Sequence, residues 1–204
     1  MTKVDNKTFD MVHGTQQIYR KLLDCMARPG KTQSISDSIH MIEPVHGFSP
    51  GLLAIAYTLV DREASFHVIS NQRDEVSQYL HWKTFSHLEK VEQAPYIFIQ
   101  EQLDDQEIHE LMTKVNHGTL EDPHSSATLI INIKSFNSGI KMKLTGPGID
   151  GNKECYVAGL SPKWFAEREF TNKEYPLGVD LILVAESEEV MAIPRTTLIE
   201  SECS

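Results

Sequence analysis

The stretch PLGVDLILVAESEEVMAIPRTT, residues 176–197, decides the fold. It contains two apolar runs, residues 181–184 and 190–193, with a short polar connection between them. An unbroken apolar run is typical of a strand covered on both faces, because a strand with one wet face alternates apolar and polar residues. The polar connection predicts a hairpin. We therefore expect an α/β protein whose sheet is covered on both sides.

Two opposite charges border these apolar runs. A four-residue loop over residues 186–189 would place Asp180 directly opposite Arg195. A three- or five-residue loop would place Pro194 or Thr196 at that position instead. We expect Asp180 to lie at or near the interior, where removing one partner of a buried ion pair costs roughly 3–5 kcal/mol. The pair either only fixes the strand register or takes part in binding a ligand, and both interpretations remain open.

The composition and charge of the chain exclude several classes of protein. With 40% hydrophobic and 24% charged residues the chain is typical of globular proteins, and its 204 residues predict a single domain over residues 1–204. The net charge of −10, without a basic run, argues against nucleic acid and anionic membranes as partners. The longest apolar stretch, residues 51–60, is too short to cross a bilayer. The polar start MTKVDNKTFD lacks a secretory signal, so we expect a cytoplasmic protein.

Few side chains offer a pattern for catalysis or metal binding. The three cysteines, Cys25, Cys155 and Cys203, lie far apart and form no CxxC motif, so we expect reduced thiols. The nine histidines include no HExxH motif or compact ligand spacing, which predicts no metal site. Ser125 and Ser126 lack the Gly-x-Ser-x-Gly turn of a hydrolase nucleophile. These patterns predict no catalytic residue.

Periodicity and turn signals predict alternating helices and strands. The expected helices cover about residues 8–27, 51–60, 71–83, 108–118 and 161–170, and the expected strands cover residues 64–70, 95–100, 127–133, 139–146 and 153–157. The first helix is expected to pack one face on a core, with an apolar set at helical spacing that consists of Val12, Tyr19, Leu22, Leu23 and Met26. Strands 127–133 and 139–146 are predicted to pair as a hairpin across a KSFNS turn. We expect one α/β domain with a mixed sheet flanked by helices, parallel in the first half and antiparallel at the later hairpins.

Two further positions have alternative interpretations. The turn LTGPGID, residues 144–150, contains Gly146 and Gly148, which either form a plain turn or let the backbone approach a phosphate closely. The turn has neither the spacing and lysine of a P-loop nor a dinucleotide fingerprint. Arg28, in MARPG at the end of the first predicted helix, either complements the helix dipole or reaches a ligand anion.

Three of these stretches also carry a resemblance to a known family. The sequences IYRKLLDCMARPG near the start, LTGPGI in the middle and YPLGVDLILVAESEEVMAIPRTT near the end resemble the PhnH subunit of the bacterial carbon–phosphorus lyase system. They span most of the chain in the family's order. The last is the most specific, because Pro-Leu-Gly-x-Asp followed at this distance by Ile-Pro-Arg-Thr-Thr is a long and uncommon combination.

The resemblance implies a role in the use of alkylphosphonates as phosphorus sources. In that pathway a multisubunit complex, alpha-D-ribose 1-methylphosphonate 5-triphosphate synthase, exchanges the adenine of MgATP for an alkylphosphonate. The chain would be a homodimeric subunit of this transferase, with the other core subunits as partners, and would not be catalytic alone. Its fold would be similar to the large domain of pyridoxal-phosphate-dependent transferases, without the cofactor. MgATP would be the substrate of the complex, and no cofactor would be bound by this chain.

At the level of residues, the resemblance marks positions rather than roles. The matching positions are Gly146, Gly148, Gly178, Asp180, Pro194, Arg195 and Thr196. We hypothesise that Asp180 and Arg195 lock the C-terminal hairpin, and that this hairpin helps to form a subunit contact or an anion-facing cleft. Two alternatives are a self-sufficient, diverged pyridoxal-phosphate-like transferase and a nucleotide-binding module. The candidate Schiff-base lysines for the first alternative are Lys134, Lys141, Lys143 and Lys153.

Overall fold

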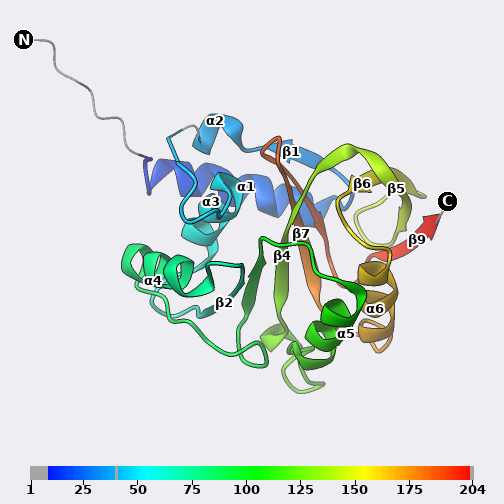
Figure 1. Ribbon diagram of the computed structural model, residues 1–204. Coiled ribbons are helices and arrows are strands. Elements are labelled where there is room, and N and C mark those ends of the chain that lie inside the picture. The colour runs from blue at the N-terminus through cyan, green and yellow to red at the C-terminus, as the bar shows by residue number, and fades with distance from the viewer. Residues whose placement is uncertain (1–8, 40, 203–204) are drawn as a thin grey trace, which may run out of the picture.

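The apolar run that opens this chain's C-terminal hairpin forms β7 (Asp180–Ala185), which lies inside a six-stranded sheet of the computed structural model (Figure 1). The structure describes residues 9–39 and 41–202. All six residues of β7 are buried. β7 runs parallel to β4 (Thr128–Ile133) on one side and antiparallel to β8 (Glu189–Ile193) on the other, so its backbone is hydrogen-bonded along both edges.

Within the described residues, the large sheet has the strand order β1-β8-β7-β4-β3-β2. The remaining strands of this sheet are β1 (Thr32–Ser34), β2 (Phe66–Ile69) and β3 (Tyr96–Ile99). Strands β2, β3, β4 and β7 are mutually parallel, and β8 and β1 continue the sheet antiparallel. A second sheet of three antiparallel strands contains β5 (Ser135–Thr145), β6 (Lys153–Ala158) and β9 (Leu198–Glu202), in the order β6-β5-β9. The predicted mixed sheet is confirmed.

Helices cover both faces of the large sheet, as Figure 1 shows. One face is covered by α1 (His13–Ala27), the short α2 (Ser36–Ile39), α3 (Pro50–Leu59) and α4 (Arg73–Thr84). The other face is covered by α5 (Asp105–Lys114), α6 (Lys163–Thr171) and the second sheet, and a 3-10 turn (Pro123–Ser125) precedes β4. Ser49 accepts a hydrogen bond from the Leu52 backbone N–H at 3.2 Å and caps α3. The predicted α/β class with flanking helices is confirmed.

Alternate residues of β7 enter different cores. Leu181 and Leu183 belong to the core under α5, α6 and the second sheet. Ile182 and Val184 belong to the core under α1, α3 and α4. Because successive side chains of a strand point to opposite faces, a strand between two cores must be apolar at every position. This explains the unbroken apolar run, because neither face of β7 is exposed to solvent.

The predicted hairpin between strands 127–133 and 139–146 is wrong. β4 stays in the large sheet, while β5 begins at Ser135 and pairs with β6 and β9 in the second sheet. The KSFNS segment is not a turn, because Ser135 is already paired with Ala158 and the strand then runs through an irregularity to Ile140. The alternation over residues 139–146 predicted a half-buried strand correctly, but alternation alone does not identify its partner strand.

The buried face of α1 agrees with the prediction in part, because Leu22 is buried and Met26 packs against the core, whereas the other three predicted side chains are exposed. Ile18, Leu22 and Cys25 are its buried large side chains, at the spacing of one helical face. Val12 is 73% exposed, Tyr19 48% and Leu23 49%. The helix thus leaves apolar side chains outside the core, although its predicted position in the sequence is close to the observed one.

Both sheets share one hydrophobic core. The core cluster on the α5 and α6 face contains Leu129 and Leu181 from the large sheet together with Met142 and Val157 from the second sheet. A single domain follows from this shared burial over the described residues. The likeness to the large domain of pyridoxal-phosphate-dependent transferases stays a prediction.

Glu167 links α6 to α5 and gives the fold a testable acid sensitivity. It accepts hydrogen bonds from Lys163 at 2.7 Å and from His109 at 3.1 Å. The bond from Lys163, and after it the one from His109, holds the pKa of Glu167 below its ordinary value of 4.5. A carboxyl group with a lowered folded-state pKa contributes stability above its unfolded pKa, and this contribution is lost as the pH falls below about 4.5.

Glu167→Gln is therefore expected to reduce the fall in thermal unfolding midpoint between about pH 5 and about pH 3. The matched control is Glu169→Gln, on the exposed side of the same helix, which should keep the wild-type pH profile. Identical profiles for all three proteins would show that other carboxylates cause the acid sensitivity.

Candidate functional site

Asp180 and Arg195 form a multiply hydrogen-bonded ion pair at the start of β7. The Arg195 side chain donates from Nη2 to Asp180 Oδ2 at 2.6 Å and from Nε to Oδ1 at 3.4 Å. The backbone N–H of Arg195 also donates to Oδ1 at 2.6 Å. Asp180 is 8% exposed, so the carboxylate lies in the interior, as the sequence indicated. The carboxylate therefore holds both the main chain and the side chain of Arg195.

The hairpin loop before Arg195 does not have the four residues that would place Arg195 directly opposite Asp180. Leu181 pairs with Ile193 and Val184 with Val190, so the loop covers residues 186–188 and Pro194 lies opposite Asp180. The three-residue alternative is the correct one. It is made possible by Glu188, whose φ of 63° is the left-handed conformation that closes three-residue hairpins. The ion pair forms all the same, because the chain turns after Pro194 and brings the next N–H to the carboxylate.

Arg168 of α6 is a functional candidate that sequence reasoning missed. It is 3% exposed and donates from Nη2 to the Pro194 carbonyl at 2.6 Å and from Nη1 to the Thr197 carbonyl at 3.1 Å. Pro194 and Thr197 are the two ends of a turn closed by a Thr197 N–H bond at 2.9 Å. Burial lowers the pKa of Arg168 to about 10, while the charge of Asp180 acts in the opposite direction. The missed signal was its position four residues after the buried Trp164, on the apolar face of the helix.

Asn172 joins the segment just before β7 to the same turn. Its Nδ2 donates to the Val179 carbonyl at 3.0 Å and to the Arg195 carbonyl at 3.3 Å, and its Oδ1 accepts the Val179 N–H at 2.8 Å. A Cβ on Gly178 would overlap the Asn172 side chain. These side chains form what we call the buried polar cluster: Arg168 and Asp180 are buried, Asn172 and Arg195 are half-buried, and Gly178 provides the space for them.

The two glycines of the LTGPG turn pack against backbone from elsewhere in the chain. A Cβ on Gly146 would lie 2.9 Å from the Thr196 carbonyl oxygen, and a Cβ on Gly148 would overlap the Ala27 carbonyl oxygen. The end of α1, the turn after β5 and the turn after β8 thus meet at one place. Among the sequence-predicted positions, Gly146 and Thr196 are brought into direct contact, and Thr196 contributes a carbonyl to it.

Arg28 lies apart from the buried polar cluster, on the surface at the C-terminal end of α1. Its guanidinium pairs with Asp24, one turn earlier in the helix, and its side chain is 62% exposed. Asp24 also accepts bonds from Lys31 and Gln33. Arg28 is therefore part of a surface network that closes the end of the helix.

A comparison with known protein families matches nearly the whole chain to one family. The family model described as "Bacterial phosphonate metabolism protein (PhnH)" matches residues 7–200, which include all the segments described above. The chain belongs to the PhnH family. The match extends from before α1 into β9, so family membership covers both sheets.

Two relatives resemble the chain over most of its length. One, from Stutzerimonas stutzeri, is named as a C-P lyase subunit protein, HtxG; it is 31% identical over 186 residues, or 89% of this chain and 84% of the relative. The other, from Rhizobium meliloti (strain 1021), is named alpha-D-ribose 1-methylphosphonate 5-triphosphate synthase subunit PhnH. It is 28% identical over 196 residues, or 95% of this chain and 94% of the relative. The family resemblance drawn from the three segments is confirmed.

In this PhnH-family chain the buried polar cluster binds the protein itself. Each of the three guanidinium nitrogens of Arg195 donates to a protein acceptor, including the Pro123 carbonyl at 2.7 Å from Nη1. The side chain of Arg195 is 18% exposed. A guanidinium used in this way holds strand ends together, because at least one N–H of each nitrogen donates to the protein itself.

The two cysteines in the described part of the chain are also unreactive. Burial raises the pKa of Cys25 to about 12 and that of Cys155 to about 11, so both are thiols rather than thiolates at neutral pH. No group of three His, Cys, Asp or Glu side chains among the described residues is arranged to hold a metal ion. Cys203 lies outside the described residues. No helix in the described part of the chain has the length and apolar character of a membrane span.

The four lysines considered as Schiff-base candidates occupy different surroundings. Lys141 pairs with Glu154 at 3.0 Å and Lys143 with Glu200 at 3.3 Å, both on the second sheet. Lys153 packs its side chain beside Gly30. Lys134 lines a pocket at the end of β4. Of the four, Lys134 therefore has the position best suited to contact a small molecule.

Proposed function

We propose that this chain is a non-catalytic subunit of the carbon–phosphorus lyase complex. The step to which it contributes is the formation of alkylphosphonate ribose 5-triphosphate from MgATP and an alkylphosphonate, with release of adenine. Support comes from its PhnH-family membership and from relatives named as C-P lyase and synthase subunits. The partners in this proposal are the other core subunits and a second copy of the chain, in the cytoplasm. MgATP is the substrate of the complex, and no cofactor is bound by this chain.

The observation that carries the proposal is that the two charged residues of the family's motif form hydrogen bonds within the protein itself. Asp180 and Arg195 are bonded to each other, and Arg195 is also bonded to the Pro123 carbonyl. Catalytic charges must reach substrate atoms, usually over about 2.6–3.2 Å. Charges that fix a turn instead give the chain a rigid shape, and shape is what an accessory subunit contributes.

Two exposed aromatic side chains, on either side of Asn172 in the sequence, support a contact with another subunit. Phe170, near the end of α6, is 79% exposed, and Tyr175, in the YPLG motif, is 77% exposed. Phe170 lines a groove of about 460 Å³ between α5 and α6. Aromatic side chains are enriched among the residues that dominate protein interfaces, and water-exposed aromatic rings gain most from being covered.

A reconstituted complex tests the proposal. Adenine release from MgATP and methylphosphonate is expected to depend on adding this chain to the other core subunits, whereas the chain alone should release none. A variant with Phe170→Ser and Tyr175→Ser is expected neither to copurify with the other subunits nor to restore adenine release.

The matched control replaces two exposed aromatics at the end of α4, on the other side of the sheet, by serine: Trp82 and Phe85. This control should retain adenine release. Loss of release only in the control would place the subunit contact on α4, and full release without the chain would contradict the proposed function.

A further inference from the structure

A pocket of about 290 Å³ lies at the carboxyl ends of the parallel strands β3 and β4. Its walls come from the segments after these strands, the end of β6 and the start of α6; the lining residues that matter below are Glu101, Leu103, Asn132, Lys134, Gly159 and Trp164. The carboxyl edge of a parallel sheet is the usual position of ligand sites in open α/β folds. We call this cavity the carboxyl-edge pocket.

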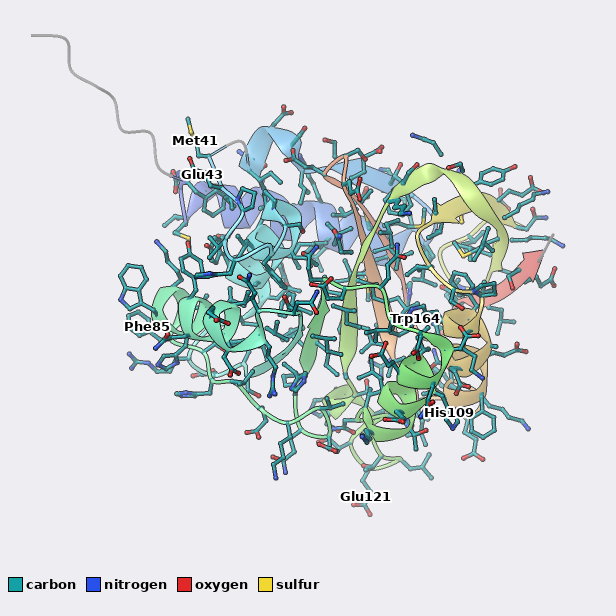
Figure 2. The ribbon with its side chains drawn as sticks, in the orientation of Figure 1. Met41, Glu43, Phe85, His109, Glu121 and Trp164 are labelled. Atoms are coloured by element: carbon teal, nitrogen blue, oxygen red, sulfur yellow. The ribbon has the colours of Figure 1, made fainter. Side chains whose placement is uncertain are left out.

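The walls of the carboxyl-edge pocket are fixed by contacts between the two sheets. The Lys134 N–H donates to the Ala158 carbonyl at 2.9 Å, which joins the end of β4 to the end of β6. A Cβ on Gly159 would lie 2.8 Å from the Lys134 nitrogen, so only glycine permits this approach. Trp164, labelled in Figure 2, is 2% exposed and belongs to the core. The pocket is therefore preformed.

The pocket contains polar groups whose binding capacity is not used up by the protein. Lys134 forms no ion pair with any described residue, in contrast to Lys141 and Lys143. Asn132 also lines the pocket, and its Oδ1 is buried away from the open space without a hydrogen-bond partner in the described structure. Glu101 accepts a long bond, 3.3 Å, from the Asn71 N–H.

We propose that the carboxyl-edge pocket binds a short aminoalkylphosphonate. The Lys134 ammonium would face the phosphonate oxygens, and the carboxylate of Glu101 would accept hydrogen bonds from the ligand's ammonium group. Leu103 and Trp164 supply the apolar surface for the alkyl chain. The choice of a phosphonate among tetrahedral oxyanions rests on the proposed function. The opposite charges on the pocket wall come from the structure alone.

Size and charge separate this ligand from a nucleotide. A volume of about 290 Å³ is at the lower limit of the roughly 300–1,000 Å³ of pockets that hold drug-sized molecules. A triphosphate would also bring several negative charges toward Glu101, with one lysine to compensate them. The pocket is thus suited to a small ligand carrying charges of both signs.

The chain's two tryptophans allow a direct binding measurement. In a Trp82→Phe variant, Trp164 is the remaining tryptophan and lies in the pocket wall, so its fluorescence reports occupancy. Titration with 2-aminoethylphosphonate is expected to give a saturable change. Methylphosphonate and inorganic phosphate, which lack the ammonium group, and β-alanine, which lacks the phosphonate, should each bind about tenfold more weakly.

Charge-removing variants then assign the contacts. Lys134→Gln is expected to weaken 2-aminoethylphosphonate binding about tenfold, whereas Lys114→Gln, at an exposed position of α5, should leave it unchanged. Glu101→Gln should weaken 2-aminoethylphosphonate binding but not methylphosphonate binding. Preserved thermal unfolding midpoints would show that each variant is folded.

Several outcomes would overturn the proposal. These are the absence of a saturable change, equal effects of Lys134→Gln and Lys114→Gln, and tighter binding of MgATP than of 2-aminoethylphosphonate. Equal binding of phosphate and 2-aminoethylphosphonate would reduce the site to a general oxyanion site and reject the phosphonate assignment. Failure here, with adenine release still dependent on the chain, would leave the proposed function intact; binding without that dependence would reject the proposed function alone.

Discussion

Asp180→Asn is expected to lower the free energy of unfolding by about 3–5 kcal/mol, measured by urea denaturation. The substitution keeps the shape of the side chain and removes its charge. Arg195 would then lose its countercharge in a largely buried position, and Arg168, which is 3% exposed, would lose the nearby charge that offsets its burial. Two cations would remain beside one turn without a carboxylate, and uncompensated buried charge is among the costliest defects in a fold.

A double-mutant cycle tests whether Asp180 and Arg195 stabilise the fold through their contact with each other or independently. Arg195→Gln and the double variant Asp180→Asn with Arg195→Gln complete the cycle, and the double variant should lose clearly less stability than the two single losses together. Additive losses would refute the lock. The exposed pair Lys143 and Glu200 provides the control, because removing either charge from a solvated pair should change stability little.

The sequence predicted those parts of the fold that depend on the local residue pattern of a single strand or helix. The apolar run of β7 predicted a strand with two covered faces, since each of its side chains enters one of two cores. The helix expected at residues 51–60 also has a local cause, because Ser49 caps α3 and Pro50 occupies its first turn. Both features depend on a few neighbouring residues, which is why they could be found without the structure.

The parts that were missed depend on partners distant in the sequence or on unusual backbone. The hairpin register depends on Glu188, a non-glycine residue in the left-handed conformation, and no residue pattern at this loop distinguishes three residues from four. β5 joins a second sheet because its partners are β6 and β9, which follow it in the chain. Arg168 was missed because an arginine on a short helix is usually solvated, and only the position of the turn 194–197 shows what it binds.

Gly148→Ala is expected to be the second most damaging substitution, with a loss of about 2–5 kcal/mol in urea denaturation. Gly148 has a φ of 83°, a conformation that costs a residue with a Cβ about 1–2 kcal/mol. The added Cβ would also overlap the Ala27 carbonyl oxygen at the end of α1, and overpacking of this kind costs about 1–3 kcal/mol.

Gly151→Ala is the matched control, because it separates backbone strain from packing. Gly151 lies in the same connection between β5 and β6, has a φ of 69°, and has nothing within 4 Å of the position of a Cβ. It should therefore lose only the backbone part, about 1–2 kcal/mol. If the two variants lost equal stability, the contact with α1 would contribute nothing. A larger loss at Gly148 would show that the LTGPG turn is held against the end of α1, a contact that a solvent-facing phosphate cradle would lack.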